Sequence, residues 1–281
     1  MNSIINWISE PFVYPFMQDA LLTALVVSIV CAVLSCYLIL KGWSLMGDAI
    51  SHAVLPGVVL AYVIGLPLAA GAFGSGLFCA LSVGYLKENS RIKEDTVMGI
   101  VFSGMFAFGL VIFTKVETEQ HLMHILFGNL LGVTHSELIQ TIILSTLILA
   151  IIILKRKDFL LYCFDPSHSR VVGQKPRILH YTLLILLSLT IVSAMQVVGV
   201  ILVVAMLISP GVTAYILSKR FDYMLIIATF VSVFTSILGT IISYHIDGAT
   251  GACIVLLQAL VFILALTYKK IQQKWFALSQ S

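Results

Sequence analysis

Charged residues are scarce in this sequence. Lysine, arginine, aspartate and glutamate together make up 10% of the 281 residues, whereas hydrophobic residues make up 60% and the mean hydropathy is +1.07. Soluble domains carry about 25% charged residues, so the composition excludes an ordinary soluble protein. The charges stand in short breaks between apolar runs, which leaves no stretch for a separate soluble domain. We therefore expect one membrane domain over residues 1–281 with an all-α fold, a polytopic transmembrane helical bundle.

Several functional motifs are absent as well. No phosphate-binding loop of the form GxxxxGK[ST] occurs, so the chain does not hydrolyse ATP by that chemistry. No HExxH or comparable cluster occurs, which weighs against an intramembrane metalloenzyme. A proton-coupled secondary transporter would carry more carboxylates within its spans or an obvious inverted repeat, and neither is seen. The five cysteines form no CxxC pair and are expected to pack as small apolar residues.

Long apolar runs are abundant. A membrane-spanning helix needs about 20 mostly apolar residues. The stretch from Arg177 to Lys219 has no charged residue between its ends, which is too long for one crossing, and Gly199 near its middle is the expected turn. Nine spans result, or eight if short neighbours merge. The expected spans are 18–40, 48–65, 67–87, 96–115, 136–154, 178–197, 199–217, 223–244 and 250–268.

The basic residues indicate how the chain crosses the membrane. With nine spans, nearly every lysine and arginine lies on one side of the membrane, and the notable exception is Lys115. The positive-inside rule makes that side the cytoplasm, with the N-terminus outside and the C-terminus inside. The net charge of +3 therefore reflects how the chain is oriented in the lipid membrane, and it gives no indication of nucleic-acid binding. The basic segments are 41–48, 87–95, 155–177, 218–222 and 268–274.

Asp48 and His52 are four residues apart at the second expected span. On a helix this spacing places them on one face, with Cβ atoms about 5–6 Å apart. Ionisable groups at membrane depth usually line a polar path or pair with one another. A carboxylate oxygen and an imidazole nitrogen suit Mn(II), Fe(II) or Zn(II). The structural alternative is that Asp48 caps the span and His52 bonds to a backbone carbonyl.

Two ligands are too few for a selective metal site. A symmetric dimer would place two aspartates and two histidines around one ion, so we expect one ion per dimer, held between the copies. Small residues near the pair would allow two such helices to approach closely. These small residues are Ala49, Ser51, Ala53 and Gly57.

Two prolines suggest bendable helices near this path. Pro56 cannot donate a hydrogen bond to the carbonyl of His52, so that oxygen is expected to be free, and Gly57 permits close backbone approach. Pro210 is expected to free the carbonyl of Met206 and to mark a mobile or kinked segment. These features suit gates, and they equally suit structural kinks.

The longest loop on the basic side, residues 155–177, contains the signals of a short helix. Asp165 suits the N-cap, Pro166 the first helical position and Gly173 the position after the C-cap, which predicts a helix over 166–172. Elsewhere, two external pairs that each contain a histidine are weaker metal candidates, because such histidines more often serve only in hydrogen bonds. These pairs are His121 with His124, and His245 with Asp247.

Four stretches of the sequence resemble one family. "LKGWSLMGDAISHAVLPGVVLAYVIG" (40–65) is similar to the membrane permease subunits of the ATP-driven manganese, zinc and iron importers, the ABC-3 family. The likeness continues through "HILFGNLLGV" (124–133), "VGVILVVAMLISPGVTAYIL" (198–217) and "DGATGACIVLLQALVF" (247–262). It covers almost the whole chain in order. The resemblance implies an ABC importer type II-like permease in a bacterial plasma membrane.

The resemblance also implies partners and residue roles. The permease would form a homodimer or pair with a related permease, dock two cytoplasmic ATP-binding cassette subunits, and receive metal from an external or periplasmic binding protein. It would have no cofactor of its own. Asp48 and His52 would be the metal ligands. The motif "GDAISHA" resembles the manganese and iron branch, whereas zinc members read closer to "GDTLAHA", so manganese is expected first, iron second and zinc as the alternative. The coupling helix would involve Phe164, Asp165, Arg170 and Gly173.

Overall fold

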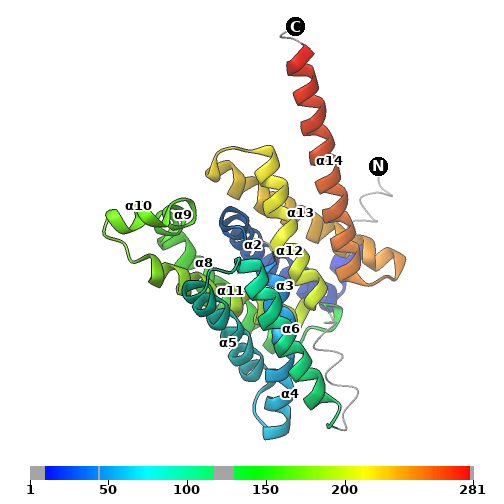
Figure 1. The fold of residues 1–281 in the computed structure, drawn as a ribbon. Coiled ribbons are helices and arrows are strands. Elements are labelled where there is room, and N and C mark those ends of the chain that lie inside the picture. The colour runs from blue at the N-terminus through cyan, green and yellow to red at the C-terminus, as the bar shows by residue number, and fades with distance from the viewer. Residues whose placement is uncertain (1–9, 44, 117–129, 279–281) are drawn as a thin grey trace.

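The computed structural model describes residues 10–43, 45–116 and 130–278 of the chain. The described residues form helices and no strand (Figure 1). The elements are η1 (Glu10–Val13), α2 (Pro15–Lys41), α3 (Met46–Ala53), α4 (Leu55–Ile64), α5 (Leu68–Asn89), α6 (Glu94–Phe113), η2 (Leu130–Gly132), α8 (His135–Leu154), α9 (Arg156–Phe164), α10 (Pro166–Val171), α11 (Pro176–Val198), α12 (Val200–Leu217), α13 (Phe221–Ile246) and α14 (Thr250–Leu278).

The nine expected spans are confirmed, and the alternative of eight is wrong. Within the described ranges, nine helical segments are long and apolar enough to cross a membrane, with α3 and α4 together forming one crossing over Met46–Ile64. Gly199 separates α11 from α12 with a φ of 81° and a ψ of 163°. Only glycine adopts such a backbone conformation at little cost, which is why this residue ends one span and begins the next.

The bundle has a buried centre and exposed peripheral helices. In the most apolar stretches of α2 and α11, 67% of the residues are buried, against 17% in α6 and 22% in α14. Helix α2 packs against both α12 and α13. In Figure 1, α9, α10, the turn between α12 and α13, and the C-terminal half of α14 lie at the upper end, opposite the α4–α5 turn. Most basic segments therefore share one end of the bundle.

Helix α4 makes close backbone contacts with two neighbours. A Cβ atom on Gly71 of α5 would overlap the carbonyl oxygen of Gly57 and lie 2.5 Å from Cβ of Ala61. On the other side, a Cβ atom on Gly109 of α6 would lie 2.8 Å from Cδ of Pro56. Small residues allow helix backbones to approach in this way, and such packing is the main attraction between helices in lipid. The segment that follows the Asp48–His52 pair is therefore fixed between α5 and α6.

We predict that Gly71→Ala destabilises the bundle, because its methyl group would overlap the backbone of α4. Such overpacking costs about 1–3 kcal/mol, which lowers the apparent Tm in detergent by roughly 2–10 °C. The matched control is Gly74→Ala on the same helix, because a Cβ atom there meets nothing within 4 Å. The control is expected to be neutral or slightly stabilising. Equal melting temperatures for the two variants would contradict the close approach.

Candidate functional site

Helix α3 carries the Asp48–His52 pair. Its N-cap is Leu45, and Asp48 lies in the first turn while His52 lies in the last. The alternative that Asp48 is the capping residue is therefore wrong. A carboxylate in the first turn is still favoured by the helix dipole. The pair consequently occupies one helix that begins and ends within two turns.

The two side chains face each other on the open side of α3. His52 Nε2 lies 3.4 Å from Asp48 Oδ1, and the side chains of His52 and Asp48 are 39% and 41% exposed. The imidazole ring packs edge-on against Phe106 of α6 at 5.5 Å between centroids, with Phe102 at 6.3 Å. The aromatic side chains fix the orientation of the ring, while the carboxylate and imidazole remain accessible.

The spacing of these two atoms fits one metal ion. Metal bonds to imidazole nitrogen and carboxylate oxygen are about 2.1 Å long. Two neighbouring ligand atoms are then about 3.0 Å apart around an octahedral ion and about 3.4 Å apart around a tetrahedral one. The observed separation of 3.4 Å lies within this range. One divalent ion could therefore bind both atoms with little movement of the side chains.

Within the described residues, one copy of the chain offers only two candidate metal ligands at this position. The part of the chain that the structure describes holds no group of three or more histidine, cysteine, aspartate or glutamate side chains able to bind a metal. His121 and His124 lie outside the described residues. His245 lies in the last turn of α13 and Asp247 is the C-cap of that helix, so this pair belongs to the α13–α14 turn.

The small residues around the pair serve packing within one copy. Ala49, Ser51 and Ala53 are buried, and Gly57 packs against Gly71. The expectation that they form a surface between two copies is therefore wrong. The side of α3 left open carries Asp48 and His52 themselves, because the other residues of the helix are inside the protein. The buried residues of α3 are Met46, Gly47, Ala49, Ile50, Ser51 and Ala53.

The break after α3 differs from the expectation for Pro56. The backbone N–H groups at the C-cap of α3 donate to the carbonyls of Ile50 and His52, so the carbonyl of His52 already accepts a hydrogen bond. Val54 keeps helical backbone angles and links α3 to α4 with little change of direction in the backbone. Pro56 has no N–H to donate to the carbonyl of His52, but the turn tightens so that another backbone N–H does so. The carbonyl of His52 is therefore not left free for a metal ion. The gating roles of Pro56 and Gly57 stay predictions.

The proline in α12 is supported by α2. Pro210 lies inside the helix, and the Ser35 hydroxyl accepts a hydrogen bond from the Gly211 N–H at 3.0 Å while donating to the Ile208 carbonyl at 3.3 Å. A Cβ atom on Gly211 would lie 2.8 Å from the backbone of Ser35. One hydroxyl group thus satisfies two backbone groups beside the proline. Any gating movement at Pro210 has to displace α2 or break these bonds.

The predicted short helix in the basic loop is present as α10, one residue shorter than expected. The Asp165 side chain accepts hydrogen bonds from the N–H groups of Ser167 and His168 at 2.9 and 3.0 Å. Gly173 has a φ of 87°. The Gly173 N–H donates to the carbonyl of Arg170, and the N–H of the next residue, Gln174, donates to the carbonyl of Ser169. This pair of bonds is a Schellman motif, which requires the left-handed conformation at the glycine.

Residues 164–173, which join the end of α9 to α10 and its C-terminal turn, present apolar side chains outward from a fixed base. Phe164 is 66% exposed and Val171 is 83% exposed. The buried Ser169 hydroxyl donates to the Gln174 side chain, which in turn donates to Asp158 of α9, each at 2.7 Å. In α9, burial raises the pKa of the Cys163 thiol to about 12, so this cysteine packs as a neutral residue. We call residues 164–173 the docking segment.

A chain of aromatic contacts connects α9 to α3. The Tyr162 hydroxyl lies 2.8 Å from His180 Nδ1 of α11. The His180 ring packs edge-on against Trp43 at 5.2 Å, and the Trp43 carbonyl accepts the N–H of Met46, the first residue of α3. His180 was not predicted as a functional residue, although a histidine inside an apolar run is a recognisable signal in the sequence. Ser35 and Gly71 had no distinguishing signal.

Comparison with known proteins places this geometry in context. The pattern of the ABC 3 transport family matches residues 13–269. The chain is 70% identical over 269 residues to the "Probable iron transport system membrane protein" of Haemophilus influenzae, covering 96% of this chain and 99% of that one. It is 49% identical over 274 residues to the manganese transport system membrane protein MntB of Synechocystis, covering 96% and 90%.

A solved structure has the same fold. The structure of PsaBC from Streptococcus pneumoniae in complex with Fab superposes with a TM-score of 0.82 at 40% sequence identity, covering 93% of this chain and 95% of that chain. The match extends over nearly the whole chain.

Proposed function

Because the chain belongs to the ABC 3 transport family, we propose that it is the membrane permease subunit of an ATP-driven importer of divalent manganese and iron. An external metal-binding protein delivers the ion, which passes between two permease copies by way of Asp48 and His52 and enters the cytoplasm. The observation that carries the proposal is the ligand pair on the open side of α3, with its atoms 3.4 Å apart.

The incomplete site favours a dimer. Mn(II) and Fe(II) take about six ligands from carboxylate, imidazole and water. Two copies of α3 related by a twofold axis supply four ligand side chains, and water can complete the shell. The ligands are exposed in one copy, which is the arrangement that a site between copies requires.

The energy for transport comes from a partner ATPase in this proposal. The sequence has no phosphate-binding loop of its own. The docking segment offers two exposed apolar side chains, Phe164 at the end of α9 and Val171 on α10, whose two ends are capped. This arrangement suits insertion into a cleft of a cytoplasmic ATP-binding cassette subunit. Movement there would reach α3 through the contacts of Tyr162, His180 and Trp43. The N-terminus then lies outside the inner membrane and the C-terminus lies in the cytoplasm.

The choice of ions follows from the ligands and the relatives. Carboxylate and imidazole bind both Mn(II) and Fe(II), and the relatives carry the names of both metals. We therefore propose that both are carried. Zinc is the alternative, because the same ligands bind it. Membership of a transport family leaves no support for an intramembrane metalloenzyme.

We predict that Asp48→Ala and His52→Ala each lower manganese uptake at least roughly tenfold in proteoliposomes that contain the ATPase and the binding protein. Loss of even a supporting group around a metal costs about 10–100-fold in affinity or activity, and these residues are the ligands themselves. Excess Fe(II) should compete with manganese, whereas strong competition by Zn(II) alone would favour the zinc alternative.

Matched controls for this experiment are Asp95→Ala and His135→Ala. Both residues are exposed and lie at the start of other helices, so the same chemical changes there should leave uptake within about twofold of the wild-type rate, as surface substitutions usually do. Near-normal uptake by both folded site variants would refute the assignment of the ligands.

A second prediction concerns the docking segment. Gly173→Val should weaken co-purification with the ATPase, because a β-branched residue resists the left-handed conformation that closes α10. Gly173→Asn is the matched control, since asparagine tolerates that conformation. We expect binding to fall at least roughly fivefold for valine, the effect of about 1 kcal/mol of strain, and to remain near normal for asparagine.

In the same assay, His180→Phe distinguishes ATPase binding at the docking segment from the transfer of movement between that segment and α3. It keeps an aromatic ring beside Trp43 and removes the nitrogen that meets the Tyr162 hydroxyl. ATPase binding should persist while the uptake rate falls. Unchanged binding for Gly173→Val would show that the docking segment is not the contact.

A further inference from the structure

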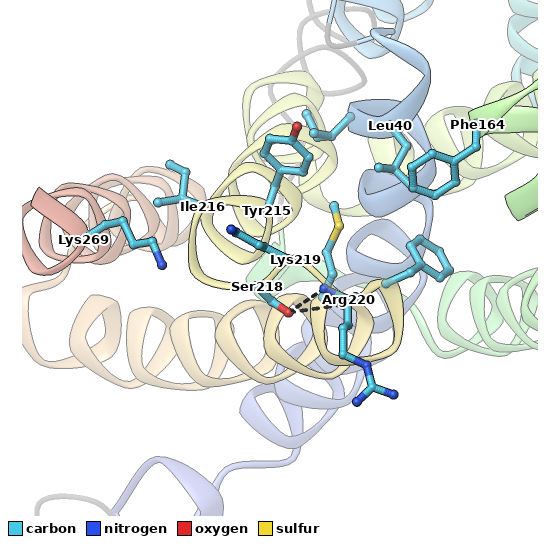
Figure 2. Close-up of a pocket in the computed structure, with 11 residues that line it drawn as sticks. Leu40, Phe164, Tyr215, Ile216, Ser218, Lys219, Arg220 and Lys269 are labelled. Carbon is cyan, nitrogen blue, oxygen red and sulfur yellow. Dashed lines mark hydrogen bonds between the residues drawn. The ribbon is translucent and has the colours of Figure 1, made fainter. Parts of the chain in front are cut away.

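A cavity of about 490 Å³ lies at the basic end of the bundle, outside the metal path (Figure 2). The ends of α2, α12, α13 and α14 surround it, and Phe164 of the docking segment reaches its edge. Lys219, Arg220 and Lys269 line it. In Figure 2, Lys269 extends from α14 toward Lys219, whereas the guanidinium of Arg220 is directed away from them. The cavity thus brings cations together from the α12–α13 turn and from α14.

No carboxylate of the described residues neutralises these cations. Among the described residues, none of the three forms an ion pair with a carboxylate, and Asp222 is already paired with Arg156. The guanidinium of Arg220 lies over the ring of Tyr223 at 5.2 Å, and Lys269 donates one hydrogen bond to Gln272 at 3.2 Å. An ammonium group has three donors, so Lys269 keeps capacity for a further acceptor.

Apart from Ser218, the remaining lining residues are aliphatic, aromatic or methionine side chains, and the cavity lies where a span ends. Ile39, Ile216 and the buried Met224 are among the lining residues. Lys219 is the first charged residue after Arg177, and Lys269 is the first after Asp247. Both therefore terminate long uncharged stretches, at the level where lipid headgroups meet the protein. The cavity offers cations at headgroup level beside surfaces suited to glycerol and the first acyl carbons.

We propose that this cavity binds the phosphate headgroup of an anionic phospholipid from the cytoplasmic leaflet. Basic pockets between spans on that side bind such headgroups. The exposed Tyr215 lines the cavity. Two more exposed tyrosines are close to its basic residues: Tyr223 lies under the guanidinium of Arg220, and Tyr268 precedes Lys269 in the sequence. Tyrosine is enriched where membrane meets water, which favours a lipid over a protein partner. The assignment to the cytoplasmic leaflet rests on the orientation proposed above.

The test uses the purified permease with its ATPase and titrates phosphatidylglycerol, with phosphatidylcholine as the neutral comparison, while native mass spectrometry counts bound lipid. Each basic residue near a membrane contributes about a fivefold gain in affinity for anionic lipid. Lys219→Gln combined with Lys269→Gln should therefore weaken phosphatidylglycerol binding roughly 25-fold. Lys270→Gln is the matched control, because Lys270 follows Lys269 on α14, is exposed and does not line the cavity. As a single surface charge outside the cavity, it should weaken binding by no more than about fivefold, well short of the double variant.

Three outcomes would overturn the proposal. Equal binding of phosphatidylglycerol and phosphatidylcholine would show that the charge has no role. Displacement of the lipid by millimolar inorganic phosphate would identify a site for a free anion. Unchanged lipid binding by the double variant, accompanied by loss of the ATPase, would assign the cavity to docking. Labelling of a Lys270→Cys variant from one side of the membrane checks the orientation separately, so failure of the orientation and failure of lipid binding are distinguishable.

Discussion

A divalent metal ion that crosses a membrane must exchange some of its water ligands for others. This constraint decides which side chains a metal permease has to place along the path of the ion. Mn(II) and Fe(II) take about six ligands, whereas α3 supplies one carboxylate and one imidazole. Their atoms are 3.4 Å apart and partly exposed, so they are placed to bind a common ion that still has coordination positions open. In the proposed function, the missing ligands come from water and from a second copy. The dimer, rather than the single chain, is then the proposed unit that carries the ion.

The surrounding helices hold the ligands in place by close packing. A Cβ atom on Gly47 would lie 3.2 Å from the side chain of Leu207 in α12, and α4 is fixed through Gly57 and Pro56. Packed protein interiors transmit displacements because they contain little free space. The contact of His180 with Trp43 lies at the start of α3, opposite the end held by α5 and α6. A displacement of α9 would consequently act on one end of a helix whose other end is fixed.

Much of the fold could be predicted from the sequence, since membrane spans are set by length and apolarity alone. The turn at Gly199 and the capped helix α10 followed from local residues, because caps and left-handed glycines depend on a few neighbouring positions. The placement of Asp48 and His52 side by side could be predicted for the same reason, because their spacing is local to one helix.

Other features depend on contacts between distant segments. The expectation that Pro56 frees the His52 carbonyl failed because the turn tightened around it. Ala49 and Ala53 looked like interface residues, yet they are buried within one copy. The Ser35 hydroxyl that bonds to α12 beside Pro210 comes from α2, far away in the sequence. Which face of a helix meets which neighbour is decided by the assembled bundle, so hydropathy does not reveal it.

The most direct measurement of the shared site counts ions and nitrogen ligands in a covalently linked dimer loaded with Mn(II). The account predicts one ion per dimer, with pulsed electron paramagnetic resonance detecting two equivalent imidazole nitrogens from the two His52 side chains. Asp48→Ala in one copy alone should weaken that single site. Two ions per dimer, each with one imidazole nitrogen and one of them unaltered in the linked variant, would contradict it.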